Sequence, residues 1–330
     1  MRKYHVYGLG AALVDTEIEV SDQDLTMLGV DKGVMTLVDR ERQETILNTL
    51  EGHLIHAKQA SGGSAANSII AASYFGAKTF YSCKVADDAL GEFYMNDLRA
   101  AGVDANYSQK SVEGVTGTCL VMITPDAERS MNTYLGISET LSASELHHAA
   151  LKDSEYLYME GYLVTSPTGR AAAIEAREMA QANGVKTALS FSDPGMVEFF
   201  RDGLQEMLGG GVDMIFCNQD EALGWAQSST LNDAVAALKK VARTFAITLG
   251  AKGALVFDGE QLIEIEPRAV SAVDTNGAGD MFAGAFLYGI TNGLNFADAG
   301  RLASISAAEV VSNYGPRLPA AKHGELLATA

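Results

Sequence analysis

The chain has 330 residues, of which 47% are hydrophobic and 20% are charged, and this balance excludes a disordered protein and suffices for a large core. The 42 acidic residues outnumber the 24 basic ones and give a net charge of −18, which argues against nucleic acid or an anionic membrane surface as a partner. An anionic ligand would therefore have to be met locally, by backbone dipoles or by bound metal.

The sequence also argues against export and against metal-binding cysteines. No apolar run has the length of a signal peptide or of a membrane span. Cys83, Cys119 and Cys217 are odd in number and far apart, so neither a disulfide framework nor a zinc site is expected. We therefore expect a cytoplasmic protein with no membrane partner.

Strands and helices are expected to alternate along most of the chain. The first expected strand covers residues 4–10, a second apolar run covers 34–38, and a helix over 63–75 leads into a strand over 79–85. From residue 153 onward the expected order is strand 156–159, helix 169–183, strand 186–191, helix 196–208, strand 214–217 running into a helix through 225, helix 231–241 and strand 245–249. A hairpin of strands 254–257 and 262–265, a strand over 269–273 and a helix over 281–291 complete the order.

This alternation predicts an α/β fold whose mostly parallel central sheet has helices on both faces. Two segments differ, about residues 14–59 and 107–134, and they are predicted to be strand-rich insertions that pair into a small sheet covering one end of the main domain. No repeat or linker interrupts the chain, so residues 1–330 are expected to form a single unit.

A glycine-rich turn separates the expected strand 269–273 from the helix 281–291. It reads Asp274-Thr275-Asn276-Gly277-Ala278-Gly279-Asp280. A turn of this kind at a helix start directs free N–H groups and the positive end of the helix dipole at one point, which suits a phosphoryl group. Asp280 would lie beside this anion hole of Gly277, Ala278 and Gly279 and accept the proton of an attacking hydroxyl. The same pattern also suits a tight turn with an ordinary helix cap.

This turn, together with Gly284 and Ala285, resembles the second signature of the ribokinase-like carbohydrate kinases, the phosphofructokinase-B (PfkB) family. Residues 8–15, 61–67, 218–221 and 248–253 are similar to four further elements of that family, in the same order. The resemblance implies a three-layer α/β/α domain with a β-sheet lid, and ATP and Mg²⁺ as cofactors. It also implies activation by a monovalent cation such as K⁺, for which the sequence has no readable signature.

The resemblance assigns one group of residues to the acceptor. Asp15 is expected to bond two adjacent hydroxyls, which a carboxylate can do with its two oxygens. The other expected substrate contacts are Gly62, Gly63, Ser64, Asn67, Thr118 and Tyr162. A solvated loop carboxylate and a plain helix entry are the alternatives for Asp15 and for the double glycine.

A second group is assigned to the nucleotide. Asn218 and Glu221 match an Asn-x-x-Glu element and are expected to order Mg²⁺ partly through water, although a capped helix start explains them too. Asn218 is also expected to contact the nucleotide, with Thr248, Gly250, Gly253, Asn276 and Asn313. Arg129, on a polar turn between two lid strands, is expected to neutralise the transferred phosphate when the lid closes, or else to be a surface arginine.

The motifs of other enzyme classes are incomplete or absent in the sequence. Gly8-x-Gly10 suggests a dinucleotide fold, but Leu13 occupies the third glycine position. The sequence has no Gly-Lys dipeptide of a Walker loop, no Gly-x-Ser-x-Gly elbow and no His-Glu-x-x-His motif.

Several details within the family look closest to adenosine kinases, in residues 63–69, 116–119, 129–136, 161–165 and 274–277. The sequence departs at Ala65-Ala66, where family members usually carry Thr-Gln. Five apolar residues could sandwich a purine or belong to the core: Leu13, Leu37, Tyr134, Leu135 and Tyr162.

The predicted activity is ATP-dependent transfer of the γ-phosphate to the primary hydroxyl of a ribofuranosyl substrate, adenosine or a related nucleoside. A kinase of a free sugar such as ribose or fructose is the alternative within the family, and a catalytically silent nucleotide- or sugar-binding sensor is the alternative outside it. Open edges on a lid sheet would allow subunit pairing, so both a monomer and a homodimer are compatible with the sequence.

Overall fold

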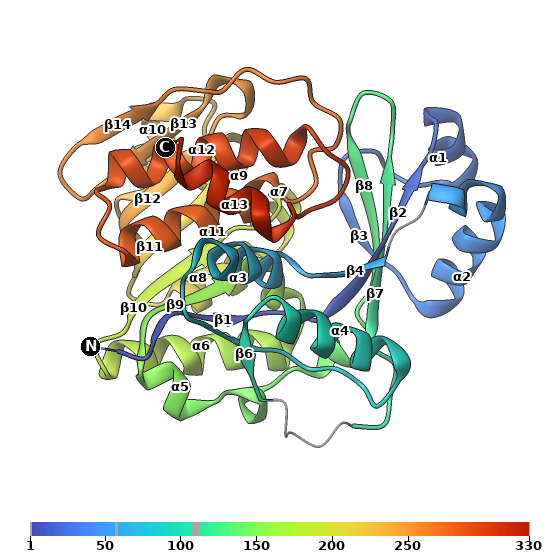
Figure 1. The fold of residues 1–330 in the computed structure, drawn as a ribbon, viewed down its shortest axis with the longest axis horizontal. Helices are drawn as coiled ribbons and strands as arrows, with labels where there is room; N and C mark the ends of the chain where they lie inside the picture. The colour runs from blue at the N-terminus through green and yellow to red at the C-terminus, as the bar shows by residue number, and fades with distance from the viewer. Residues whose placement is uncertain (1, 57–58, 107–111, 330) are drawn as a thin grey trace.

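Two β-sheets organise the molecule, a nine-stranded sheet in the body and a five-stranded sheet in the lid (Figure 1). The computed structural model describes residues 2–56, 59–106 and 112–329. Residues 57–58 and 107–111 of the two predicted lid segments lie outside the described residues. The mostly parallel central sheet and the small lid sheet confirm the predicted fold class.

The body sheet has the strand order β14-β13-β12-β11-β10-β9-β1-β5-β6. All neighbours are parallel except β12–β13 and β13–β14, which form the predicted hairpin end. The strands are β1 (Tyr4–Leu9), β5 (Thr79–Ser82), β6 (Asp104–Ala105), β9 (Ser154–Glu160), β10 (Lys186–Ser190), β11 (Val212–Asn218), β12 (Ala242–Thr248), β13 (Ala254–Phe257) and β14 (Leu262–Ile265).

Helices cover both faces of this sheet and bury a separate apolar core on each, which makes the three layers. One core is formed with α5 (His148–Lys152), α6 (Pro167–Ala182), α7 (Pro194–Phe199), α8 (Arg201–Leu208), α9 (Gln219–Ala226) and α10 (Leu231–Leu238). The other is formed with α3 (Ser64–Phe75), α4 (Ala89–Ala100), α11 (Ala278–Thr291), α12 (Phe296–Val311) and α13 (Ala320–Leu327). Short 3₁₀ turns are η1 (Glu51–His56), η2 (Gly136–Thr140), η3 (Ala143–Glu145), η4 (Gly161–Thr165) and η5 (Gly250–Lys252).

The strand order reverses at β1, which places a crevice at the carboxyl ends of β1 and β9. From β1 the sheet extends through β5 on one side, whereas β9 to β12 follow one another on the other side. Ligands of open α/β sheets bind at such switch points. The turn after β1 and the residues after β9 therefore meet where a site is expected.

The lid sheet has the order β3-β8-β7-β2-β4, with β2 (Leu13–Glu19), β3 (Met35–Leu37), β4 (Gln59–Gly62), β7 (Gly117–Ile123) and β8 (Arg129–Tyr134). Helices α1 (Asp22–Leu28) and α2 (Arg40–Thr49) pack on its outer face, where Leu120 and Met122 of β7 join their core. The intervening Cys119, Val121 and Ile123 form a second cluster with Leu13 and Met131. The segment 14–59 thus carries two helices as well as strands, which the strand-rich interpretation missed.

Four stretches of chain join the lid to the body within the described residues, and they pack against one another. A Cβ atom on Gly63 would lie 2.5 Å from the carbonyl oxygen of Ala11. A Cβ atom on Gly117 would lie 2.5 Å from the carbonyl oxygen of Leu135, and the N–H of Ile137 donates to Val115 across 2.8 Å. The four connections therefore lie together at one end of the lid strands.

Two predicted elements are wrong. The helix expected over 196–208 is divided into α7 and α8, because Phe200 leaves helical dihedral angles (φ −122°, ψ 24°). The strand expected over 269–273 is absent: residues 266–272 are exposed, and the N–H groups of Val273 and Asp274 both donate to the carbonyl of Val311 at the end of α12. Among the described residues, no helix combines the length and the apolar character needed to cross a membrane.

Candidate active site

A cavity of about 630 Å³ lies between the lid and the carboxyl ends of the body strands. Most of the predicted site residues line it: Asp15, Gly63, Ser64, Asn67, Arg129, Tyr162, Asn218, Glu221, Thr248, Gly250, Gly253, Asn276, Gly277, Ala278, Gly279 and Asp280. Gly62, Thr118 and Asn313 do not line it. Residues far apart in the sequence thus converge on one cavity.

Asp280 is the third residue of α11, and two side chains of α3 hold its carboxylate. Ser64 Oγ donates to Oδ1 across 2.6 Å, and Asn67 Nδ2 donates to Oδ2 across 3.0 Å. Burial raises the pKa of Asp280, whereas these two hydrogen bonds and the charge of Arg129 lower it. Each carboxylate oxygen has accepted one bond and can accept another, so a hydroxyl in the cavity can still be bound.

Gly277 begins the helix in a conformation that suits glycine. Its φ is +74°, and a Cβ atom there would lie 2.3 Å from the backbone oxygen of Pro316. Gly279 differs, because a Cβ atom on it would meet nothing within 4 Å. The predicted anion hole differs at Ala278, whose N–H donates to the carbonyl of Thr275 across 3.4 Å. The N–H groups of Gly277 and Gly279 find no backbone acceptor among the described residues, so they are free to bind an anion at the positive end of α11.

Arg129, at the start of β8, reaches from the lid to the glycine turn. Its Nη1 donates to the carbonyl of Thr275 across 2.8 Å, and Thr275 Oγ1 donates to the carbonyl of Ala127 across 3.1 Å. Ala127 is buried with φ +66°, an uncommon conformation for a residue other than glycine. The lid turn and the glycine turn are therefore linked by two hydrogen bonds that run in opposite directions.

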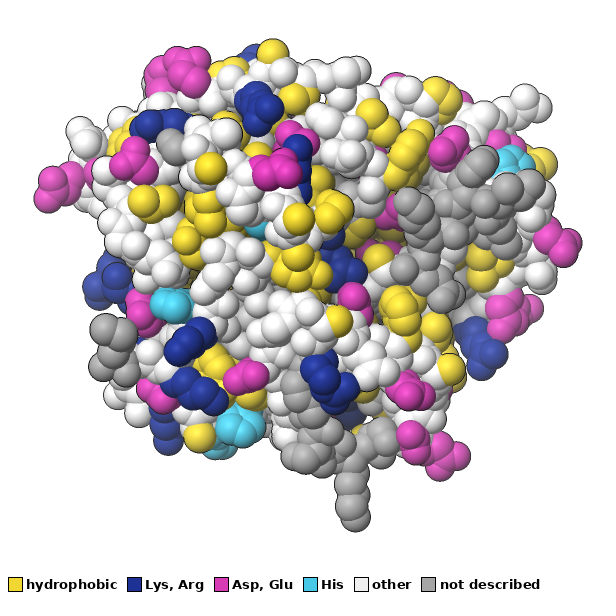
Figure 2. Space-filling view, in the orientation of Figure 1, with side chains coloured by type: hydrophobic (Ala, Val, Ile, Leu, Met, Phe, Trp, Pro, Cys, Tyr) yellow, Lys and Arg dark blue, Asp and Glu magenta, His cyan; other side chains and the backbone are white. Residues whose placement is uncertain are grey.

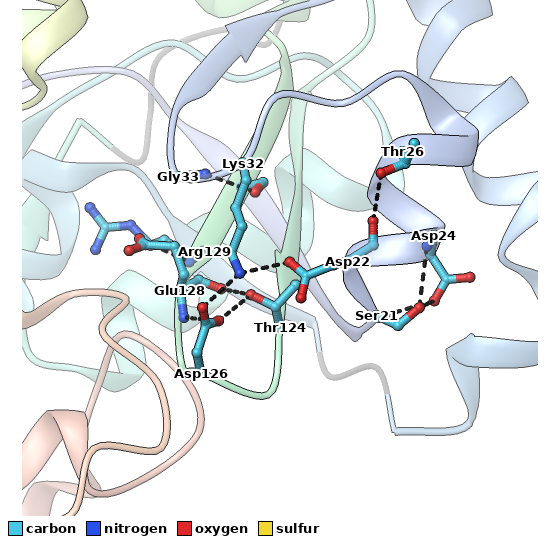
Figure 3. Close-up of polar contacts among 11 residues, drawn as sticks. Ser21, Asp22, Asp24, Thr26, Lys32, Gly33, Thr124, Asp126, Glu128 and Arg129 are labelled. Carbon is cyan, nitrogen blue, oxygen red and sulfur yellow. Dashed lines mark hydrogen bonds and ion pairs between the residues drawn. The ribbon is translucent and has the colours of Figure 1, made fainter.

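Lys32 anchors the turn that carries Arg129 (Figure 3). Its Nζ lies 2.6 Å from Asp126 Oδ2 and 2.7 Å from Asp22 Oδ1, while Thr124 Oγ1 donates to the other oxygen of Asp126. The turn is consequently held from the side of α1, within the lid.

Asp15 lies on β2 at the lid side of the cavity and is 6% exposed. None of the described residues donates a hydrogen bond to its carboxylate, whose pKa burial and the charge of Glu17 raise to about 8. The carboxylate packs on Gly62, where a Cβ atom would lie 2.1 Å from it. Gly62 thus makes room for Asp15, instead of letting the backbone approach a ligand as expected.

The side chain of Thr118 points away from the cavity. Its Oγ1 donates across 2.6 Å to Gln43 of α2, on the outer side of the lid sheet. Since side chains alternate along a strand, Cys119 faces the cavity, opposite Asp15 in the strand register. The side chain of Thr118 is therefore not placed to contact a ligand in the cavity as expected.

Glu160, which the sequence interpretation missed, ends β9 at the switch point and is 1% exposed. It accepts hydrogen bonds from the N–H of Ala11 across 2.7 Å and of Ala65 across 2.8 Å. Burial raises its pKa to about 7, although those two bonds oppose the shift. Its place directly after an apolar strand was the signal that could have identified it.

Asn218 and Glu221 form a capping box at the start of α9. Asn218 Oδ1 accepts from the N–H of Glu221 across 2.8 Å, while the two oxygens of Glu221 accept from the N–H and the Nδ2 of Asn218. Burial raises the pKa of Glu221 to about 8, and the charge of Asp193 adds to the effect. A cation bound nearby would offset the negative charge of Glu221. Because each carboxylate oxygen of Glu221 already accepts one hydrogen bond from Asn218, the cation would contact the pair through water.

The other residues that the resemblance assigns to the nucleotide do not all lie in the cavity. Thr248 ends β12 beside Asn218, and Gly250 and Gly253 follow it at the cavity wall. Asn276 is 7% exposed and its Nδ2 has no partner among the described residues. Asn313 is exposed, and its Nδ2 donates to the carbonyl of Glu309 in the last turn of α12, outside the cavity.

An apolar wall lines the lid side of the cavity. It consists of Leu13, Met35, Leu37, Cys119, Met131 and Leu135 from the lid, with Tyr162 and Leu163 from η4. Tyr134, which was grouped with them in the sequence, is not part of the lining. The wall places apolar surface within the same cavity as Asp15 and Asn67.

Basic side chains on the face shown in Figure 2 lie in small, separate groups among acidic ones. This agrees with the net charge of −18. A polyanionic ligand would thus depend on Arg129 and Arg268, which line the cavity, and on backbone N–H groups inside it.

Comparisons with known proteins give the family. Residues 33–323 match the family described as pfkB family carbohydrate kinase. The chain is 30% identical to an adenosine kinase of Schizophyllum commune, over 96% of this chain and 97% of that protein, and 30% identical to a ribokinase of Mus musculus, over 72% and 74%.

Solved structures agree with these sequence matches. An adenosine kinase from Sinorhizobium meliloti superposes with a TM-score of 0.94 at 33% identity, and it covers 99% of this chain and 100% of its own. A probable sugar kinase from Rhizobium etli gives a TM-score of 0.92 at 32% identity, with the same coverage. The chain therefore belongs to the pfkB family of carbohydrate kinases.

Proposed function

We propose that this chain transfers the γ-phosphate of ATP to the primary hydroxyl of a ribofuranosyl substrate, namely adenosine or a related nucleoside. The observation that carries the proposal is the apolar wall beside Asp15 and Asn67, because a nucleoside has both a polar sugar and a flat apolar base. The unpartnered, buried Oδ1 of Asn67 and the undonated carboxylate of Asp15 suit the hydroxyls of a sugar.

The transfer follows from the arrangement around α11. Asp280 accepts the proton of the primary hydroxyl while the hydroxyl oxygen bonds to phosphorus and the bond from phosphorus to the leaving oxygen of ADP breaks. The N–H groups of Gly277 and Gly279 bind the negatively charged oxygens of the group in transfer. Arg129 neutralises the same charge from the lid side.

Mg²⁺, when bound, would neutralise phosphate charge near Asn218 and Glu221. The donors there are amide and carboxylate oxygens, which suit this ion. In the protein itself, the capping box fixes these two side chains at the cavity edge, so their bonds to metal-bound water would be directed.

Nucleosides and free sugars can be separated by one experiment, a coupled ADP-release assay over adenosine, guanosine, cytidine, D-ribose and D-fructose. Burying about 100 Å² of base against the apolar wall contributes about 2.5 kcal/mol. We therefore expect kcat/KM for adenosine to exceed that for D-ribose by roughly 50-fold or more. A preference for D-ribose would contradict the proposal.

The free-sugar alternative is supported by the similarity to the mouse ribokinase, and preference for a sugar in this assay would select it. A silent sensor is the other alternative. It would show thermal stabilisation by ligands and no ADP release with any acceptor.

A further inference from the structure

Arg317 lies outside the cavity, on the segment between α12 and α13, and ties the body to the lid strand β4. Its Nη2 lies 2.8 Å from Asp97 Oδ2 of α4, and these side chains are 14% and 28% exposed. The same oxygen of Asp97 accepts a hydrogen bond from the hydroxyl of Ser61, on β4. A partly buried ion pair thus holds a strand of the lid.

This strand supports Asp15. Ser61 pairs with Val14, and the next residue, Gly62, is the one on which the Asp15 carboxylate packs. Tyr94 of α4 also holds the strand, since its hydroxyl donates to the carbonyl of Gly62 across 3.1 Å. A shift of β4 would therefore move or release Asp15.

The backbone beside Arg317 also touches the glycine turn. The N–H of Gly315 donates across 2.9 Å to Asp274 Oδ2, and the other oxygen of Asp274 accepts from the N–H of Asn276. Pro316 is the residue against which Gly277 packs. Residues 315–317 are consequently linked both to β4, through Asp97, and to the glycine turn at the start of α11.

The charges around Asp15 are mostly negative. Glu17 lies on the same strand, Asp280 approaches from α11, and the Cys119 thiol faces it from β7. Behind β4, α4 contributes Asp97, which is bonded to Ser61 and Arg317, and the Tyr94 phenol, which is bonded to Gly62. Of the described residues, Arg317 supplies the positive charge that lowers the pKa of Asp15 against burial and the charge of Glu17.

We propose that Arg317 is a positioning residue for acceptor binding, which fixes β4 beneath Asp15 and brings a positive charge to a site where Asp15 lies with Glu17 and Asp280. An ionised carboxylate accepts hydrogen bonds from two hydroxyls at once and binds them more strongly than a neutral acid. The inference rests on the proposed function, which makes Asp15 the receiver of acceptor hydroxyls.

The test compares Arg317→Gln and Arg317→Lys with a control, Arg301→Gln, which removes an exposed arginine of α12 paired with Asp298. Loss of the charge raises the pKa of Asp15 further, and at a pH below that pKa fewer Asp15 carboxylates are then ionised. At pH 7 we expect KM for adenosine to rise about tenfold in Arg317→Gln, with kcat and KM for ATP little changed. The rise of kcat/KM with pH should move to higher pH in this variant, and Arg317→Lys should restore it.

A second comparison separates this role from a general loss of structure. In an Asp15→Asn background there is no carboxylate to ionise, so adding Arg317→Gln should change KM for adenosine by less than about twofold. The inference is overturned if Arg317→Gln raises KM equally at every pH, or by the same factor with and without Asp15.

Failure of the proposed function would look different. If the unmodified protein phosphorylates D-ribose and not adenosine, the same variants are measured with D-ribose. If it phosphorylates neither, adenosine-induced thermal stabilisation replaces KM. The linkage between Arg317 and Asp15 is then supported or refuted independently of the substrate.

Discussion

The hydroxyl of Ser64 donates to the carboxylate of Asp280 across 2.6 Å, so the first turns of α3 and α11 share one carboxylate. Asn67, one turn further along α3, donates to the other oxygen. These bonds orient the carboxylate before a substrate arrives, which an isolated helix cap would not require. The position of α3 thus determines the direction in which Asp280 can accept a proton.

Replacing Asp280 by Asn should abolish proton acceptance while keeping size and most hydrogen bonds. We expect kcat to fall by about 10²–10⁴-fold, the usual contribution of a positioned base. Acceptor binding, measured by isothermal titration with adenosine, should be largely kept. Ser64→Ala, which removes one orienting bond only, should reduce kcat by less than Asp280→Asn does. Normal turnover of Asp280→Asn would refute the base.

The two glycines of the anion hole should respond differently to alanine. At Gly277 the methyl group would meet the backbone of Pro316, so Gly277→Ala should lower both the melting temperature and kcat. At Gly279 there is space, and alanine favours the helix by about 1 kcal/mol, so the melting temperature should be kept or raised. Activity of Gly279→Ala should still fall, because the methyl group enters the phosphate site. Full activity of Gly279→Ala would contradict an anion hole at this turn.

The bonds between Arg129 and Thr275 allow catalysis and lid docking to be tested separately. Arg129→Met should lower kcat by about 10²-fold, as expected for the loss of one charge-stabilising donor. Thr275→Val removes only the hydroxyl that donates to Ala127 and should weaken lid docking by about 1 kcal/mol. Steady-state kinetics should therefore show a loss in kcat for the first variant and a change below about tenfold for the second. Equal losses would mean that Arg129 acts in docking alone.

Glu221 should make the protein less stable as the pH rises. Its pKa is about 8 in the folded protein and near the ordinary value of 4.5 in the unfolded chain, so folding binds a proton between these values. The stability that protonated Glu221 contributes to the folded protein is fully present below about pH 4.5 and is lost as the pH rises towards 8. The melting temperature should be measured across this pH range. In Glu221→Gln, which keeps a capping box, it should depend less on pH than in the unmodified protein and should be higher at pH 8.

Mg²⁺ provides the control for this prediction. If it binds near Glu221, added Mg²⁺ should raise the melting temperature of the unmodified protein at pH 8 more than that of Glu221→Gln. An identical pH profile in the two proteins would show that burial of Glu221 has no net cost.

The sequence predicted the body of the fold because its strands are buried and its helices amphipathic. Periodicity did not reveal the break at Phe200, since the apolar spacing continues through it and one residue changes the dihedral angles. Residues 269–273 looked like a strand, but residues 269–272 are exposed after the hairpin and the N–H of Val273 bonds the end of α12. Local composition cannot show which partner a backbone segment will find.

The site was predicted where motifs are contiguous, as in residues 274–280. Thr118 and Gly62 were misplaced because a motif gives the position of a residue but not the face of the strand on which its side chain lies. Glu160 and Arg317 belong to no quoted motif and become informative only when folding brings them beside Ala65 and Asp97. Contacts between distant segments were the part that one sequence could not supply.

Because the four connections lie together at one end of the lid strands, the lid can turn about the line that joins them. Motions that slide the lid across the body would strain four mutually packed chain crossings, whereas rotation about their line strains each of them little. Arg129 lies at the far end of β8, five residues from Tyr134, or about 17 Å from the axis at the usual rise of a strand. A rotation of about 10° would move its end of the strand by about 3 Å. This displacement is about the length of its bond to Thr275, so a small rotation suffices to engage or release it.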